Sequence, residues 1–389
     1  MQFIALAIAT LVPLIVLIVI RALDLYQTGE FRSVVLCFVW GGIAFALAYY
    51  INRYIYFRGI ATYSEIVRYF APFAEEILKA LILVYLVRRP RFTYFVDGAI
   101  YGFAAGIGFA VFENYQYVLQ NPGEGLGTAV ARVLSVNLVH ASATALVGVA
   151  LGLARFRRTA GHFGLLFGGL AAAMLLHGFF NNVNDRQIPG PILLYSAVIG
   201  LLAVGLIAFF IFRGLAEQKA WIEETLGMAD RVTAQEAKVV QRMEDVGELL
   251  KPLRQIYGDD KTDQIEKFIT LQAQLGIKRK TLEKLPDEKM RQAVEKDMDK
   301  LRADMNQARQ AVGPYIMFSV RRLFPPDDSP LYDLLNTRLQ ERLAAQPAAA
   351  SGKAWGAAFG QRLAQKPAAP PSEPPAPAEN PPAGENSSS

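Results

Sequence analysis

Seven long apolar blocks fill the first 213 residues of the chain. A membrane-spanning helix needs about 20 mostly apolar residues, and each block is long enough. The blocks are Phe3–Leu23, Ser33–Tyr56, Tyr63–Val87, Phe95–Leu119, Thr128–Leu153, Phe163–Val183 and Ile188–Phe212. The pattern therefore predicts an all-α fold, a polytopic membrane helix bundle of about seven spans, with residues 1–213 as the membrane-embedded domain.

The character of the chain changes after the last block. Residues 214–345 are rich in charged side chains, with apolar residues at helical spacing and breaks at Pro252 and Pro286. This pattern indicates a helical or coiled-coil region, which we expect to be cytoplasmic and to bind a protein partner or a second copy of the chain. Residues 346–389 are dominated by Ala, Pro, Gly and Ser, and they are predicted to be disordered because they bury too little apolar surface to fold.

Basic side chains cluster after the third, fifth and seventh blocks, at Arg88–Arg91, Arg155–Arg158 and Arg213–Lys219. Because short basic loops stay in the cytoplasm, the pattern predicts an amino terminus outside and a carboxyl terminus in the cytoplasm. The loop that contains Arg53 and Arg58 departs from this rule, and the alternative is an interfacial helix. The net charge of +5 gives no reason to expect nucleic-acid binding. The expected surroundings of the chain are the lipid bilayer.

Four of the predicted spans carry side chains that hydrocarbon disfavours. A charged side chain at the middle of a bilayer costs about 2.5–3.5 kcal/mol on the insertion scale, so such residues are functional candidates. In chain order they are Glu75, Glu76 and Lys79, then Glu113 and Asn114, then His140 and Thr144, then His177 and Asn181. Lys79 has a second interpretation as compensation for the glutamates, because an unpaired buried charge is costly.

Spacing along the helices places four ionisable groups at one depth. The groups are Glu75, Glu113, His140 and His177. At about 1.5 Å per residue, they lie roughly 20–28 Å from the cytoplasmic ends of their spans, beyond the middle of a hydrocarbon core of about 30 Å. Glycines at every fourth position of residues 98–106 let a neighbouring helix approach closely and direct Glu113 into the bundle. The sequence thus predicts one site, in the outer half of the membrane.

The segments that carry these residues resemble, in order, the motifs of the PrsW family of intramembrane proteases. They are "EEILK" at 75–79, "FAVFEN" at 109–114, "HASAT" at 140–144 and "HGFFN" at 177–181. The chain is also distantly similar to the CAAX prenyl-protease group, although Lys79 stands one residue before the Arg of that group and Glu113 stands where that group has His. The resemblance covers about residues 60–185. It implies hydrolysis of a peptide bond in a membrane-anchored protein substrate near the extracytoplasmic side.

Peptide hydrolysis needs an activated water and donors to the oxyanion. A carboxylate in a low-dielectric site suits the role of general base, and Glu75 or Glu76 can take it; the resemblance favours Glu75. His177 and Asn181 lie one helical turn apart and can donate to the oxyanion. The expected supporting residues are Lys79, Phe109, Asn114 and Thr144.

Two mechanisms remain open. In one, carboxylates and histidines act without a metal. In the other, zinc or another divalent metal is held by Glu113, His140 and His177, and Glu75 or Glu76 is a further ligand or the base. The resemblance favours the metal, because members of the family are usually classed as metalloproteases.

Two rival functions use the same residues differently. Intramembrane Glu, Lys and His can relay protons or hold ions in a transporter, but the sequence shows no inverted repeat or pair of interrupted spans. A membrane scaffold with a decayed site is the other rival, and the complete motif set argues against it. The sequence therefore predicts a peptidase of the membrane.

Overall fold

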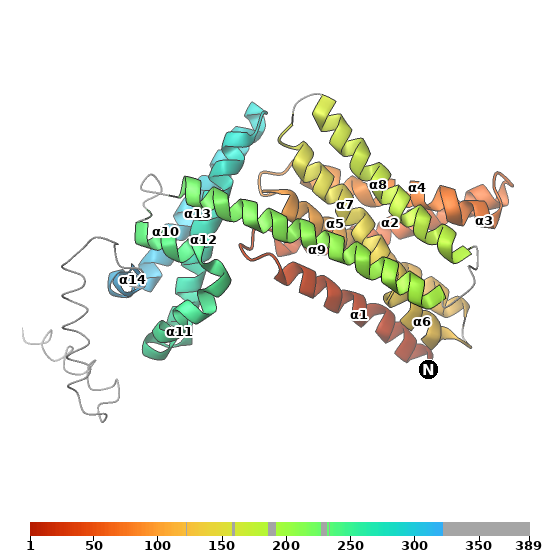
Figure 1. Ribbon diagram of the computed structural model, residues 1–389, viewed down its shortest axis with the longest axis horizontal. Helices are drawn as coiled ribbons and strands as arrows, with labels where there is room; N and C mark the ends of the chain where they lie inside the picture. The colour runs from red at the N-terminus through yellow and green to blue at the C-terminus, as the bar shows by residue number, and fades with distance from the viewer. Residues whose placement is uncertain (122, 158–159, 186–191, 227–231, 233, 322–389) are drawn as a thin grey trace, which may run out of the picture. The chain divides into compact units, whose positions relative to one another are not determined.

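The computed structural model describes residues 1–121, 123–157, 160–185, 192–226, 232 and 234–321. Every regular element among these residues is a helix, which confirms the all-α prediction. The elements of the apolar part are α1 (Gln2–Ala22), α2 (Phe31–Phe57), α3 (Tyr63–Glu65), the π-helix η1 (Ile66–Phe70), α4 (Ala71–Leu86), α5 (Phe95–Gln120), α6 (Gly125–Val133), α7 (Val136–Ala154), α8 (Ala160–Asp185) and α9 (Ile192–Thr225) (Figure 1).

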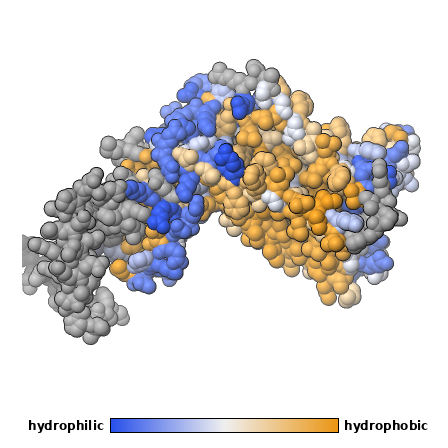
Figure 2. Space-filling model, in the orientation of Figure 1, coloured by the Kyte–Doolittle hydropathy of each residue, from blue (hydrophilic) through white to orange (hydrophobic). Residues whose placement is uncertain are grey.

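Six helical segments among the described residues are long and apolar enough to cross a membrane. They are Gln2–Ala22, Phe31–Phe57, Phe95–Gln120, Gly125–Ala154, Gly161–Asp185 and Leu193–Thr225. Their outward side chains form the apolar surface in Figure 2, and helices satisfy their own backbone hydrogen bonds in lipid. The chain is therefore a multi-pass integral membrane protein.

The structure divides the predicted span Tyr63–Val87 into three pieces. These pieces are α3, η1 and α4, of which α4 has only 16 residues. Pro72 stands in the first turn of α4, where its missing N–H costs no helical hydrogen bond. In place of seven uniform spans, the described residues have six candidate spans and this divided segment.

The charged region also folds into helices. They are α10 (Ala234–Gln241), the 3₁₀ helix η3 (Met243–Asp245), α11 (Val246–Tyr257), α12 (Asp259–Lys284), α13 (Glu288–Val312) and α14 (Pro314–Arg321). Pro286 lies in the short turn between α12 and α13, and Asp287 caps α13 by accepting a hydrogen bond from the Met290 N–H at 2.7 Å. Pro252, in contrast, lies inside α11 and does not end it. The predicted disordered tail, 346–389, lies outside the described residues.

Helix α5 is the most buried helix of the membrane part and carries the predicted glycine stripe. A Cβ atom at Gly102 would lie 2.4 Å from the carbonyl oxygen of Thr144, and one at Gly106 would lie 2.4 Å from that of His140. Real Cβ atoms essentially never come within 3.0 Å of such an atom, so only glycine permits this contact between α5 and α7. The predicted close approach is confirmed, and it brings His140 directly beside α5.

Candidate active site

The four ionisable groups predicted at one depth meet in a buried cluster. Glu113 on α5 has a carboxylate oxygen 2.9 Å from Nε2 of His140 on α7. The His140 ring lies beside the His177 ring of α8, with centroids 4.5 Å apart. Nε2 of His177 lies 3.9 Å from a carboxylate oxygen of Glu75 on α4. Four separate elements therefore contribute one side chain each to a single site.

Glu76 lies behind this cluster and is fully buried. One of its carboxylate oxygens lies 2.9 Å from Nδ1 of His177 and accepts a hydrogen bond from the Lys79 ammonium at 2.6 Å. The other oxygen accepts a hydrogen bond from the Thr144 hydroxyl at 3.1 Å. With both oxygens occupied, Glu76 holds Lys79 and His177 in place and is not free to accept a proton from a water.

Lys79 links the two halves of the cluster. Its Nζ lies 3.1 Å from Nδ1 of His140 and 4.4 Å from the centre of the Phe109 ring. An ammonium can only donate, so Nδ1 of His140 is the acceptor and Nε2 carries the proton toward Glu113. Phe109 packs against the His140 ring, with centroids 5.1 Å apart. These contacts fit the supporting positions expected for Lys79 and Phe109.

Glu75 points into a cavity of about 760 Å³ between α2, α4, α5, α6, α7 and α8. One of its carboxylate oxygens is buried without a hydrogen-bond partner among the described residues. Neighbouring helix positions diverge by about 100°, so Glu75 faces the cavity while Glu76 faces the protein interior. Glu113, His140 and His177 line the same cavity.

Arg132 is a site residue that the sequence reasoning did not single out. It lies on α6, donates from Nη2 to Glu113, and donates from Nε to the Asn114 side-chain oxygen at 2.8 Å. Its guanidinium also covers the Tyr117 ring at 3.9 Å from the centroid. The sequence did contain a signal for Arg132, because it lies inside the predicted span Thr128–Leu153 and a charge in an apolar span needs a counterion.

Asn181 lines the cavity and also has a partner within the protein. Its amide donates to the carbonyl oxygen of Val67 in η1 at 2.8 Å. This bond ties α8 to the π-helix with one amide N–H, and the amide nitrogen carries a second N–H that could serve an oxyanion. Thr144 and Asn114 contact Glu76 and Arg132, as supporting residues would.

The donor set of the cluster fits a divalent metal. Glu75, His140 and His177 each offer a ligand atom, and these atoms lie within 4.8 Å of one another. Glu75 has a carboxylate oxygen without a hydrogen-bond partner among the described residues. His177 has its Nδ1 held by Glu76, which leaves Nε2 for a metal. A histidine whose second ring nitrogen is held by a carboxylate is typical of metal sites. His140 can become a metal ligand only if one ring nitrogen gives up its present contact, either Nε2 with Glu113 or Nδ1 with Lys79.

This group shares His140 and His177 with the expected ligand set and includes Glu75, which was expected as a further ligand or as the base. Glu113, the other expected ligand, has its carboxylate held by Arg132 and His140. Glu113 nevertheless stays beside the ligand group and faces the cavity. It is thus available for proton transfer.

Comparison with known proteins gives three results. Residues 29–216 match the model of a family described as PrsW family intramembrane metalloprotease. Protease PrsW of Bacillus subtilis (strain 168) is 34% identical over 110 residues, which are 28% of this chain and 49% of that protein. Protease PrsW of Geobacillus kaustophilus (strain HTA426) is 26% identical over 168 residues, 41% of this chain and 69% of that protein. The chain thus spans about half the length of the first relative and about two thirds of the second, and no solved structure matches it significantly.

Proposed function

We propose that the chain is an intramembrane peptidase of the PrsW family, whose model matches residues 29–216, and that it cleaves a membrane-anchored protein. The observation that carries the proposal is the buried cluster of Glu75, Glu113, His140 and His177 on the wall of a cavity of about 760 Å³. Hydrolysis inside a membrane requires water, a proton acceptor and an electrophile at one point. The cluster offers a proton acceptor and ligands for a metal ion that would act as the electrophile, and the cavity offers room for water.

We assign the metal-binding role to Glu75, His140 and His177, and we propose zinc, which catalytic sites commonly hold with three His or carboxylate ligands. When bound there, zinc would polarise the substrate carbonyl and lower the pKa of a water. Glu76 has the supporting role, because its carboxylate fixes the His177 ring through Nδ1 at 2.9 Å.

Glu113 is our candidate for proton transfer. It faces the cavity, and its side chain is 17% exposed, compared with 7% for Glu75 and none for Glu76. Arg132 and His140 hold one of its oxygens, so the carboxylate is oriented before substrate arrives. From this position it would take a proton from the attacking water and return it to the leaving amine, a contribution of about 10²–10⁴-fold.

We further propose that cleavage occurs near the extracytoplasmic side. His140 precedes the end of α7 at Ala154 by fourteen residues, or roughly 21 Å of helix. The basic residues Arg155 and Arg157 follow that end and favour the cytoplasm. The site then lies in the outer half of the bilayer.

The test compares the membrane proteins of cells that carry the wild-type chain with those of cells that carry the Glu75→Gln variant. A substrate is a single-span protein whose extracytoplasmic part is released only by the wild type. A reporter built on that protein should then be cleaved by the purified wild type in liposomes and remain intact with the variant. Intact proteins in both cells, together with a proton flux through wild-type liposomes, would favour the transporter instead.

A further inference from the structure

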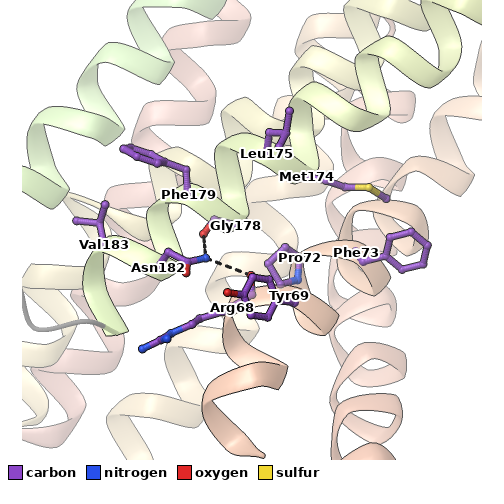
Figure 3. A pocket seen from close by; sticks show the side chains of 10 residues that line it. All are labelled: Arg68, Tyr69, Pro72, Phe73, Met174, Leu175, Gly178, Phe179, Asn182 and Val183. Atoms are coloured by element: carbon purple, nitrogen blue, oxygen red, sulfur yellow. Dashed lines mark hydrogen bonds between the residues drawn. The ribbon is translucent and has the colours of Figure 1, made fainter. Parts of the chain in front are cut away.

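A second hollow lies directly behind one wall of the catalytic cavity. It is a groove of about 610 Å³, which we call the lipid-facing groove (Figure 3). One side is formed by Tyr69, Pro72 and Phe73, and the other by Leu175, Gly178 and Phe179. The outer side chains are well exposed in the protein alone, 72% for Leu175 and 59% for Phe73. In a bilayer these apolar surfaces would face lipid.

The wall between groove and cavity is a single layer of helices. It consists of η1 and the end of α8, which we call the η1–α8 wall. Val67 and Asn181 line the catalytic cavity, whereas their chain neighbours Arg68 and Asn182 line the groove. Separation of η1 from α8 would therefore join the two hollows.

Polar contacts hold the η1–α8 wall together. Asn181 donates to the Val67 carbonyl at 2.8 Å. Asn182 donates to the Arg68 carbonyl at 3.5 Å (Figure 3). Asp185 accepts from the Ser64 hydroxyl at 2.6 Å and pairs with the Arg68 guanidinium. Hydrogen bonds of this kind exchange readily with other donors and acceptors, and each contributes little net stability. A few such bonds make a closure that can open.

Resting on the proposed function, we propose that the η1–α8 wall is a lateral gate, and that the lipid-facing groove docks the apolar transmembrane helix of the substrate. A segment in lipid must remain helical to satisfy its backbone, whereas irregular backbone is tolerated beside a water-filled cavity. The groove offers apolar side chains, and the cavity beyond the gate offers polar ones such as Asn52, Tyr63 and Gln116. A substrate helix therefore fits the groove, and its unwound cleavage site fits the cavity.

A reversible cross-link tests the gate. A Cβ atom at Gly178 would lie 3.9 Å from Cβ of Pro72, close to the separation of about 3.8 Å in disulfides. The variant is Pro72→Cys with Gly178→Cys, made in a Cys37→Ser background because Cys37 is free. The two probes are the single-span reporter cleaved by the wild type and a soluble peptide that copies its cleavage site. The oxidised variant should cleave the reporter at least tenfold more slowly, keep its rate on the peptide, and recover on reduction.

A groove-filling variant gives an independent measurement without any cross-link. Leu175→Trp places bulk in the groove at an exposed position, and Leu202→Trp is its matched control on α9, 69% exposed and away from the groove. Leu175→Trp should slow reporter cleavage several-fold and leave the peptide unaffected, while Leu202→Trp changes neither. Equal loss on both probes, or unchanged reporter cleavage after verified cross-linking, would overturn the gate. A wild type that cleaves neither probe would instead contradict the proposed peptidase.

Discussion

Glu75 and Glu76 are consecutive in α4, but only Glu75 lines the cavity of about 760 Å³. Glu75 keeps a buried oxygen without a hydrogen-bond partner among the described residues, whereas Glu76 contacts Lys79, His177 and Thr144. One carboxylate is thus left open for chemistry and the other is committed to the structure. The pair gives two neighbouring positions whose variants should behave in opposite ways.

Glu76→Gln should destabilise the protein, because it leaves the Lys79 ammonium buried without its counterion. Removal of one partner of a buried ion pair costs about 3–5 kcal/mol, so thermal unfolding in detergent should begin at a clearly lower temperature. In the presence of a chelator, where no bound metal contributes to stability, Glu75→Gln should unfold near the temperature of the wild type. With metal present, it should still lose cleavage by orders of magnitude. Equal stability of the two variants would contradict the division of roles.

Arg132 should be required for activity, because it is the cation that holds Glu113 and Asn114. Arg132→Gln should reduce the cleavage rate by about 10²-fold or more if Glu113 then loses its orientation. Arg132→Lys should be intermediate, since a lysine keeps the charge but cannot reproduce the guanidinium fork. Arg213→Gln, at an exposed position on α9, is the control. A wild-type rate for Arg132→Lys would show that the fork geometry is irrelevant, and equal rates for the Lys and Gln variants would show that the charge alone does not help.

The convergence of the site was predictable from the sequence because it depends on two regular quantities, helical rise and span direction. Those quantities are enough to bring Glu75, Glu113, His140 and His177 to one height. Periodicity alone could not choose between Glu75 and Glu76, since it does not say which side of α4 carries the cavity, and only the family resemblance favoured Glu75. Their partners decide it, and those lie on α7 and α8.

Two contacts of the site were not predicted from the sequence, because they depend on local interruptions of the α-helices. Arg132 was counted within one continuous span, but α6 ends at Val133 and α7 starts at Val136, which lets the arginine turn back to Glu113. The hydrogen bond from Asn181 to the Val67 carbonyl was not predicted, because the π-helix η1 that carries this carbonyl leaves no mark in the pattern of apolar residues.

The orientation of the chain should follow its basic clusters. A reporter fused at Gly125, at the start of α6, should read as external, and one fused at Arg157, after α7, should read as internal. The reason is the preference of short basic loops for the cytoplasm. An internal signal at Gly125 would place the active site in the inner half of the bilayer and reverse the expected side of cleavage.

Stability should fall as pH rises, because of Asp24 in the loop between α1 and α2. Burial, and then the charge of Asp97, raise the pKa of Asp24 from 3.8 to about 7. Between these values the folded protein binds more protons than the unfolded chain, so the free energy of unfolding declines from about pH 4 to pH 7 and levels off above it. Thermal unfolding of the wild type should therefore occur at a lower temperature at pH 8 than at pH 5.

Asp24→Asn is the matching variant, since it cannot ionise. The carboxylate accepts from the N–H groups of Thr28 and Gly29 on separate oxygens, and the single oxygen of asparagine keeps one of these two bonds. Its unfolding temperature should change much less between pH 5 and pH 8. The same slope in variant and wild type would assign the pH dependence to other groups.

Metal content separates the two chemical mechanisms. The wild type, purified without chelators, should contain about one zinc ion per chain, as expected for a catalytic site with three protein ligands. Glu75→Gln and His177→Ala should lower that content strongly, and Glu76→Gln should lower metal affinity by about 10–100-fold through the His177 ring that it orients. His162→Ala is the control, because Nδ1 of His162 lies 3.0 Å from the Ala154 carbonyl oxygen, away from the cluster.

A chelator should abolish cleavage and added zinc should restore it. A fully active, metal-free preparation would exclude the zinc form and leave Glu75 and Glu113 to act with the histidines alone.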